Sequence, residues 1–224
     1  MPALSPGACL LFDLDGTLVD TDRVHLAAFN RMLSPYGKRI DAHYYSREVM
    51  GFPNPMIMAK LLPDHPEDVR MAEAERKEEL FRDMVDEVEP LAGLVDLLDW
   101  ADAQGCPCGV VTNAPRANAE LMLDAIGLAA RFRTLVIGDE VARAKPDPLP
   151  YLTGLERLGG AAGRAVAFED SRSGIAAASG AGLATVGIMT SLDEASLGAV
   201  GAVLSVRDFA DPRVAELVRT RLSG

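Results

Sequence analysis

Short, continuous runs of apolar residues recur along the chain, and most of them end in polar residues or glycine. Such a run predicts a strand that is buried on both faces, because a strand with one solvent-exposed face alternates apolar and polar residues. The predicted strands are residues 8–13, 108–112, 134–137, 165–168 and 184–188. Strands that are covered on both faces are typical of a parallel sheet.

Helical patterns lie between the later runs. In residues 91–104, apolar side chains recur every three or four positions, and Gly105 follows as a stop signal. Similar patterns predict helices at residues 117–126, 148–158 and 173–181. This alternation of strands and helices predicts an α/β fold whose core is a doubly wound, Rossmann-like parallel sheet.

Residues 20–89 interrupt the alternation, because no segment there has the pattern of a strand. Helical patterns instead cover residues 24–33, 56–62 and 67–88. A crossover between neighbouring parallel strands does not need so long a segment. We therefore expect an α/β core of residues 1–19 and 90–224, and an all-helical cap domain of residues 20–89 inserted after the first strand.

Composition narrows the choice of partners. The chain has 224 residues and a net charge of −11, which disfavours a nucleic-acid partner because binding phosphates requires a basic patch. No apolar run reaches the roughly 18–20 residues that span a bilayer, and the first residues lack the basic start of a signal peptide. We expect no membrane partner and a cytoplasmic location. No pattern indicates an oligomeric state, and the three cysteines suit reduced thiols.

Two aspartates lie at the end of the first predicted strand: Asp13 is its last residue, and Asp15 stands two positions later, just before Gly16. A carboxylate can attack phosphorus and hold the phosphoryl group covalently, and a second acid nearby can protonate the departing oxygen. Asp13 and Asp15 can divide these two roles. The alternative is a turn at the end of the strand, in which both aspartates only accept hydrogen bonds from backbone amides.

A second acidic pair, Glu169 and Asp170, follows the fourth predicted strand. Together with Asp13 and Asp15 it would place four carboxylates in one crevice, where like charges need a counter-cation. Mg²⁺ fits, because it is a hard cation that prefers oxygen ligands. We predict Asp170 as a direct ligand and Glu169 as a supporting residue behind it. The alternative is a helix N-cap, in which Asp170 or Ser171 caps the helix predicted for residues 173–181.

An acidic chain that binds phosphate needs local positive charge, and Lys145 can supply it. Thr112, Asn113 and Ala114 close the second predicted strand. The hydroxyl of Thr112 and the backbone N–H groups of Asn113 and Ala114 can bind phosphoryl oxygens there. The alternatives are a solvated surface lysine at position 145 and a helix N-cap at Thr112.

Four segments, DLDGTLVDT (13–21), VVTNA (110–114), KPDP (145–148) and FEDSRSG (168–174), closely resemble the motifs of the haloacid dehalogenase superfamily. The detailed likeness is to its β-phosphoglucomutase-like and sugar-phosphatase branch, and it covers the chain nearly end to end. The resemblance implies Asp13 as the nucleophile, Asp15 as the general acid and base, and Thr112, Asn113 and Lys145 as phosphate-binding residues. It also implies Mg²⁺ held by Asp13, the backbone carbonyl of Asp15, and Asp170, with Glu169 supporting water ligands.

We therefore predict a Mg²⁺-dependent phosphatase that hydrolyses a small phosphorylated metabolite, such as a sugar phosphate, through an aspartyl-phosphate. Asp15 argues against a true dehalogenase, since a departing halide needs no proton. A non-catalytic phosphate-binding module is a further hypothesis, but binding alone needs no acid beside a nucleophile.

A β-phosphoglucomutase-like phosphomutase is the main alternative. The resemblance places His25 where that enzyme has a hinge histidine and Lys77 near one of its cap lysines. Asn54, however, stands about where the mutase resemblance calls for an arginine that grips a second phosphate. His25, Phe52 and Lys77 are the candidates for substrate contacts from the cap. The alternative for His25 is a partly exposed helix residue.

Overall fold

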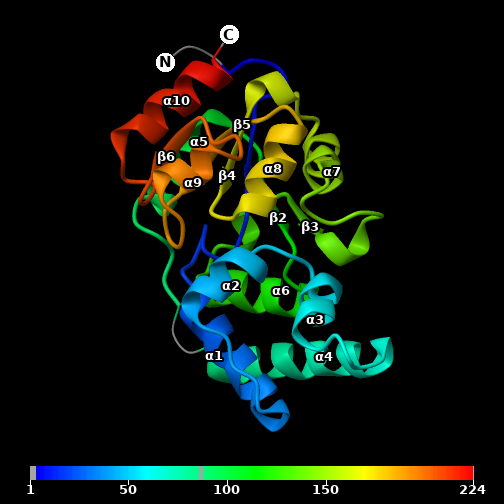
Figure 1. Ribbon diagram of the computed structural model, residues 1–224. Coiled ribbons are helices and arrows are strands. Elements are labelled where there is room, and N and C mark those ends of the chain that lie inside the picture. The colour runs from blue at the N-terminus through cyan, green and yellow to red at the C-terminus, as the bar shows by residue number, and fades with distance from the viewer. Residues whose placement is uncertain (1–3, 86–87, 224) are drawn as a thin grey trace.

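The computed structural model describes residues 4–85 and 88–223, and its centre is a parallel sheet (Figure 1). Six strands are hydrogen-bonded in the order β3-β2-β1-β4-β5-β6, and each neighbouring pair is parallel. They are β1 (Cys9–Phe12), β2 (Cys108–Thr112), β3 (Thr134–Ile137), β4 (Ala165–Glu169), β5 (Ala184–Ile188) and β6 (Leu204–Val206). This order is that of a doubly wound sheet, so the predicted fold class is confirmed.

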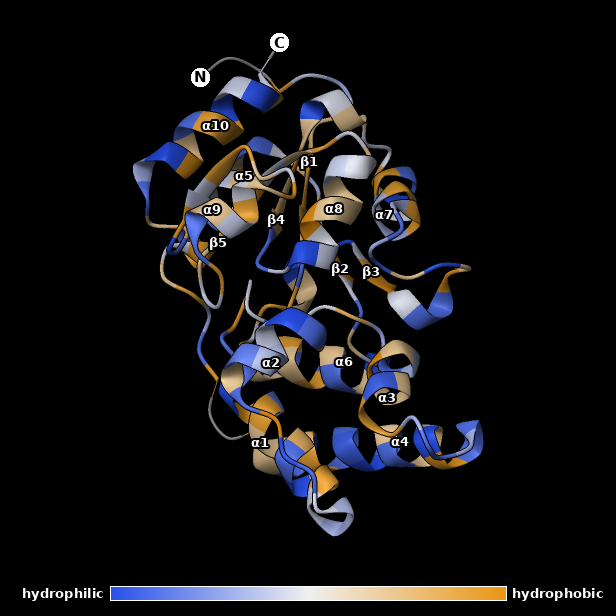
Figure 2. Ribbon diagram, viewed as in Figure 1, coloured by the Kyte–Doolittle hydropathy of each residue, from blue (hydrophilic) through white to orange (hydrophobic). Residues whose placement is uncertain are grey.

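Helices cover both faces of the sheet (Figure 1). They are α5 (Leu94–Gln104), α6 (Arg116–Ala125), α7 (Leu149–Leu158), α8 (Arg172–Gly180), α9 (Glu194–Gly198) and α10 (Pro212–Leu222). Short 3₁₀ turns occur at Ser34–Tyr36, Ala129–Arg131, Gly138–Glu140 and Ala162–Arg164. Figure 2 shows hydrophilic and hydrophobic residues mixed along α10, as expected for a helix with one face on the core.

The central strand β1 divides the core into two layers, because successive side chains of a strand point to opposite faces. Leu10 and Phe12 pack in one layer with residues of α5, α6 and α10. Cys9 and Leu11 pack in the other layer with residues of α7 and α8. Since β1 is buried on both faces, it holds the residues that follow it in a fixed position at the edge of the sheet.

Four further helices lie beyond the end of the sheet where Asp13 follows β1 (Figure 1). They are α1 (Asp22–Leu33), α2 (Ala42–Glu48), α3 (Asn54–Leu61) and α4 (Glu67–Met84). Their apolar side chains, such as Phe29, Met58 and Leu61, form a buried cluster. We refer to α1–α4 as the helical insertion; its status as a separate domain of residues 20–89 stays a prediction. Within the described residues, no helix is long and apolar enough to cross a membrane.

Some element boundaries differ from those expected. The helix predicted for residues 67–88 ends at Met84, because the backbone at Val85 is extended (φ −75°, ψ 110°) and the chain returns to the sheet; residues 86–87 lie outside the described part. The helix predicted from residue 91 begins at Leu94, and the one predicted from residue 56 begins at Asn54. The pattern did not predict β6, α2, α9 or α10.

Candidate active site

The candidate site lies where β1 and β4 end side by side. Phe12 pairs with Phe168 in the register, and the N–H of Asp13 donates to the carbonyl of Phe168 at 2.9 Å. Asp13 therefore lies next to Glu169 and Asp170, although more than 150 residues separate them in sequence. Strands β2 and β3 are added on one side of β1, whereas β4, β5 and β6 are added on its other side. Such a switch point in a parallel sheet forms a crevice at the carboxyl ends of the strands.

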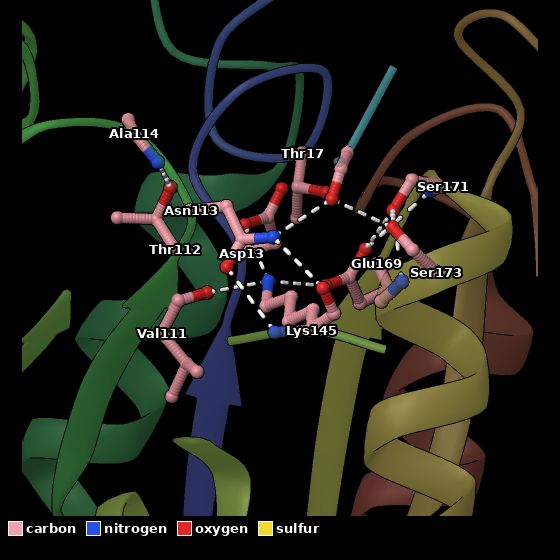
Figure 3. Close-up of polar contacts among 12 residues, drawn as sticks. Asp13, Thr17, Val111, Thr112, Asn113, Ala114, Lys145, Glu169, Ser171 and Ser173 are labelled. Atoms are coloured by element: carbon pink, nitrogen blue, oxygen red, sulfur yellow. Dashed lines mark hydrogen bonds and ion pairs between the residues drawn. The ribbon is translucent and has the colours of Figure 1, made fainter. Parts of the chain in front are cut away.

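Lys145 joins these strand ends from below (Figure 3). Its ammonium Nζ donates to Asp13 Oδ1 at 2.7 Å, to the carbonyl of Val111 at 2.7 Å and to Glu169 Oε1 at 2.5 Å. Burial favours the neutral amine, but the carboxylates of Asp13 and Glu169 outweigh that effect and raise the pKa of Lys145. The side chain is only 2 % exposed, so the alternative of a solvated surface lysine is wrong.

Three carboxylates face one another above this lysine. Ligand oxygens of Asp13, Glu169 and Asp170 all lie within 4.8 Å of one another, and all three residues are buried. Burial and the neighbouring charge of Glu169 raise the pKa of Asp13 to about 7, although Lys145 opposes the shift. Burial and the charges of Asp13 and Glu169 raise the pKa of Asp170 well above its ordinary value. One ammonium group therefore does not balance the three acids.

The same group of residues fits a divalent cation. Asp170 Oδ2 is buried and has no hydrogen-bond partner among the described residues. The donor set consists of carboxylate oxygens, which are the ligands that Mg²⁺ prefers. Gly16, with φ +74°, lets its loop approach this oxygen closely, since a Cβ there would lie 2.3 Å from Asp170 Oδ2. An unpaired, buried carboxylate oxygen of this kind is what a metal ligand requires.

Glu169 is held differently from its two neighbours. Its Oε1 accepts from Lys145 and from the hydroxyl of Tyr151 at 2.8 Å, and its Oε2 accepts from the hydroxyl of Ser171 at 3.1 Å. Ser171 also caps α8, because its Oγ accepts from the N–H of Gly174 at 3.0 Å. The N-cap expected as an alternative therefore forms through Ser171. Asp170 Oδ1 accepts from the hydroxyl of Thr17 at 3.3 Å, and only its Oδ2 lacks a partner among the described residues. Tyr151 was not among the residues predicted from the sequence.

Asp15 lines the same cavity, but its carboxylate is not part of the three-acid group, which corrects the expected group of four. Its Oδ1 accepts from the hydroxyl of Thr21 at 2.6 Å and lies 2.9 Å from His25 Nε2. Burial favours the neutral acid, but His25 and Thr21 outweigh burial, and the pKa of Asp15 is lowered. Asp15 thus lies beside Asp13 in sequence, yet the two carboxylates have different surroundings.

His25 is buried, so the expectation of a partly exposed helix residue is wrong. Its ring stacks on Phe81 with centroids 3.9 Å apart, and its Nδ1 lies 2.9 Å from Lys77 Nζ. An ammonium group only donates hydrogen bonds, so Nδ1 is the acceptor and Nε2 carries the hydrogen that faces Asp15. The two insertion candidates His25 and Lys77 therefore form one chain of contacts that ends on Asp15.

The predicted phosphate-binding segment begins at Thr112, the last residue of β2. The hydroxyl of Thr112 lines the cavity and accepts from the N–H of Ala114 at 3.0 Å. The side-chain amide of Asn113 is engaged elsewhere: its Nδ2 donates to the carbonyl of Gly51 in the helical insertion at 2.8 Å. Ser173, which the sequence analysis did not single out, donates to the same carbonyl at 2.7 Å. Asn113 and Ser173 thus join the sheet edge to the insertion.

A cavity of about 80 Å³ lies between the sheet edge and the helical insertion. It is smaller than the roughly 300 Å³ at the lower end of sites for drug-sized ligands, so it suits a small ligand. The sheet edge contributes Asp13, Lys145 and Asp170 to its lining, among others. The insertion contributes His25, Phe52, Asn54, Lys77 and Glu78. The cavity brings together the predicted residues from both parts of the chain.

The fold and the site together define an α/β enzyme with an aspartate-based centre at the carboxyl edge of its sheet. Comparison with known families identifies the family of this enzyme. Residues 10–188 match the model of the haloacid dehalogenase-like hydrolases, and the chain belongs to this family.

Individual relatives agree with this assignment. A phosphorylated carbohydrates phosphatase of Thermotoga maritima is 33 % identical over 205 residues, covering 88 % of this chain and 93 % of the relative. The fructose-1-phosphate phosphatase YqaB of Escherichia coli is 35 % identical over 184 residues, covering 81 % and 96 %. The crystal structure of a mutant of CbbY from Rhodobacter sphaeroides with xylulose-(1,5)bisphosphate has a TM-score of 0.79 and 28 % identity, covering 91 % and 95 %. The predicted superfamily and the predicted class of enzyme, a phosphatase, are confirmed.

Proposed function

We propose that the chain is a Mg²⁺-dependent phosphatase that hydrolyses a small phosphorylated metabolite, such as a sugar phosphate, through an aspartyl-phosphate on Asp13. The observation that carries the proposal is the group at the sheet edge: Asp13 and Glu169 share the ammonium of Lys145, while one oxygen of Asp170 has no partner among the described residues. The names of the relatives support the substrate class, because two of them act on phosphorylated sugars.

In the first step, the carboxylate of Asp13 attacks phosphorus and the leaving alcohol takes a proton from Asp15. Lys145 holds Asp13 in place through a 2.7 Å hydrogen bond and keeps its charge next to the phosphoryl group. Asp13 and Asp170 would hold Mg²⁺, which would supply positive charge next to the phosphoryl oxygens. The backbone N–H of Asn113 and the hydroxyl of Thr112 lie at the second strand end, where they can orient those oxygens.

In the second step, Asp15 removes a proton from water, which then hydrolyses the aspartyl-phosphate. The lowered pKa of Asp15 suits this step, because a base must be ionised. The first step needs the protonated form instead. A bound phosphate monoester brings negative charge beside Asp15, and like charge favours protonation of a carboxylate. His25 and Thr21, both bonded to Asp15 Oδ1, orient the carboxyl in either state.

A phosphomutase is the second candidate. The observation that favours it is the contact of His25 with both Asp15 and Lys77, because the mutase resemblance includes His25 and Lys77. Asn54 weighs against it: its amide donates to Glu78 at 2.8 Å, and it carries no charge that could grip a second phosphate. A mutase would return its substrate as an isomer and release almost no inorganic phosphate.

The proposal is tested by measuring phosphate release from a set of phosphorylated sugars and other small monoesters, with Mg²⁺ and with excess chelator. We expect release that needs Mg²⁺ and that is restored when Mg²⁺ is added back. Isomerisation without release would favour the phosphomutase. Full activity in excess chelator would contradict the metal requirement.

A further inference from the structure

The wall of the cavity that faces Asp13 contains two buried, oppositely charged side chains of α4. Lys77 and Glu78 are 3 % and 2 % exposed, and both line the cavity together with Asn54 from the start of α3. The mechanism proposed above uses neither Glu78 nor Asn54. Because buried charges are costly, their partners indicate what this wall can bind and what it rejects.

Two lysines line the cavity, Lys77 and Lys145, and every N–H of their ammonium groups donates to a protein acceptor. An ammonium group has three N–H donors. Those of Lys77 meet the two carboxylate oxygens of Glu78 at 3.0 and 3.1 Å and His25 Nδ1 at 2.9 Å. Those of Lys145 meet Asp13, Glu169 and the carbonyl of Val111. Among the described residues that line the cavity, no other lysine and no arginine occurs, so no free cation faces the part of the substrate beyond the phosphate.

Glu78 also fixes the amide of Asn54. Its Oε1 accepts from Asn54 Nδ2 at 2.8 Å, while its Oε2 accepts from Asn118 Nδ2 at 2.8 Å. A carboxylate accepts only, so the NH₂ group of Asn54 must point toward Glu78. This leaves the carbonyl oxygen of Asn54 and its second N–H without a partner among the described residues. These two atoms match a hydroxyl group, which both donates and accepts a hydrogen bond.

We infer that the substrate carries one phosphate on an uncharged chain that bears hydroxyl groups, and that Asn54, oriented by Glu78, is a specificity residue for those hydroxyls. The inference rests on the proposed phosphatase function and narrows its substrate class. A second phosphate or a carboxylate on the substrate would lie near Glu78 and Asp22 with no free cation to balance it. Like charges brought together in this way oppose binding strongly.

Two matched pairs of substrates test the inference on the unmodified protein. Glycerol 3-phosphate and 3-phosphoglycerate differ only in a terminal hydroxymethyl group against a carboxylate. Fructose 1-phosphate and fructose 1,6-bisphosphate differ only in a second phosphate. We expect kcat/KM for phosphate release to be higher for glycerol 3-phosphate and for fructose 1-phosphate, which carry no charged group besides the one phosphate, by about tenfold or more. This comparison needs no variant and so does not depend on the folding of one.

The substitution Glu78→Gln tests the role of the buried carboxylate. It keeps the shape and one acceptor but removes the negative charge, so that the ammonium of Lys77 becomes free to meet an anion. We expect the ratio of the two kcat/KM values in each pair to fall by about tenfold. Glu79→Gln is the matched control, because Glu79 is the neighbouring residue on the exposed side of α4 and its loss changes the net charge equally. We expect this control to leave both ratios unchanged.

The outcomes separate the two proposals. Equal kcat/KM values within each pair, or a preference for the member with the additional charged group, would overturn the inference and leave the phosphatase function in place. A ratio that is the same in the Glu78→Gln and Glu79→Gln proteins would overturn the role of Glu78. Absence of phosphate release from all four substrates and from p-nitrophenyl phosphate would instead contradict the phosphatase function itself.

Discussion

His25 Nε2 lies 2.9 Å from Asp15 Oδ1, and the same imidazole ring accepts from Lys77 through its other nitrogen. The helical insertion thus contacts the proposed acid/base residue directly. The hydrogen of His25 stabilises the ionised form of Asp15, and this contact is one cause of the lowered pKa. The protonation of Asp15 therefore depends on a residue of α1, outside the strands and loops of the sheet.

We expect His25→Gln to raise the pKa of Asp15, because the hydrogen bond that the imidazole N–H donates to the ionised carboxylate is altered. Asp15 must be ionised to activate water, so the acidic limb of the dephosphorylation rate should move to higher pH. The measurement is the pH dependence of that rate in pre-steady-state experiments. His43→Gln, on the exposed side of α2, is the control and should leave the profile in place. An unmoved profile in the His25 variant would argue against this coupling.

We expect Lys145→Met to impair both stability and activity. It removes the ammonium that Asp13 and Glu169 share, and leaving buried charges unpaired costs about 3–5 kcal/mol of unfolding free energy. We also expect kcat/KM to fall by about 10³-fold or more, by analogy with the loss of one preorganised electrostatic group. Denaturant unfolding and steady-state kinetics measure the two effects.

Lys60→Met is the matched control for that variant, because Lys60 pairs with Glu48 on the surface and surface ion pairs contribute little. It should retain stability and activity close to those of the unmodified protein. If Lys145→Met behaved like Lys60→Met in both measurements, the proposed role of Lys145 would be wrong.

Gly16→Ala tests the metal site without replacing a residue whose side chain is a proposed ligand. Its Cβ would lie 2.3 Å from Asp170 Oδ2, so we expect Asp170 to move and the Mg²⁺ concentration for half-maximal activity to rise by about tenfold or more. Gly37→Ala is the control: Gly37 also has positive φ, at +64°, but a Cβ there meets nothing within 4 Å. Both variants carry a backbone cost of about 1–2 kcal/mol, and only Gly16→Ala should change the metal dependence. An equal Mg²⁺ dependence in both would count against Asp170 as a ligand.

Glu78 predicts a pH dependence of stability. Burial opposes its ionisation, but Lys77, His25 and Asn54 outweigh burial and lower its pKa below the ordinary 4.5. A carboxyl with a lower pKa in the folded state stabilises the fold above the pKa of the unfolded chain, and this stability is lost as the pH falls through the folded pKa. We therefore expect the difference in unfolding free energy between the unmodified protein and Glu78→Gln to be largest near pH 7 and to shrink below pH 4.5. Urea unfolding at several pH values measures it, and a difference that stayed constant would contradict the assignment.

Five of the six strands, and the polar residues at the edge of the sheet, could be predicted from the sequence. Each buried strand is a continuous apolar run, and the polar residues that follow such runs meet at one edge because parallel strands end together. Lys145 and Asp13 are 132 residues apart, yet both were predicted for the same phosphate-binding site, and they meet there. The three-residue strand β6 is too short to show a pattern. Helix α10 has Val214, Val218 and Leu222 at helical spacing after Pro212, a signal that identifies it in retrospect.

Contacts between the insertion and the sheet could not be predicted in the same way. The carbonyl of Gly51 accepts from both Asn113 and Ser173. Every residue has a backbone carbonyl, so the sequence does not indicate which one accepts such a hydrogen bond. The buried pair of Lys77 and Glu78 lies on a helix whose other charged residues are exposed or half-buried, so the pattern of charges resembles that of a solvated surface. Burial of such residues depends on how the insertion packs against the sheet, which involves side chains from several elements.

The central claim is that Asp13 carries the phosphoryl group, and the most direct measurement uses p-nitrophenyl phosphate with the Asp15→Asn protein. Nitrophenolate leaves without a proton, so this variant should form the aspartyl-phosphate but hydrolyse it slowly, because it lacks the base. We predict a rapid burst of one nitrophenolate per protein molecule and, by mass spectrometry after quenching, one phosphoryl group on Asp13. The double variant Asp13→Asn/Asp15→Asn should show no burst. A burst of equal size in the double variant, or a phosphoryl group on another residue, would contradict the account.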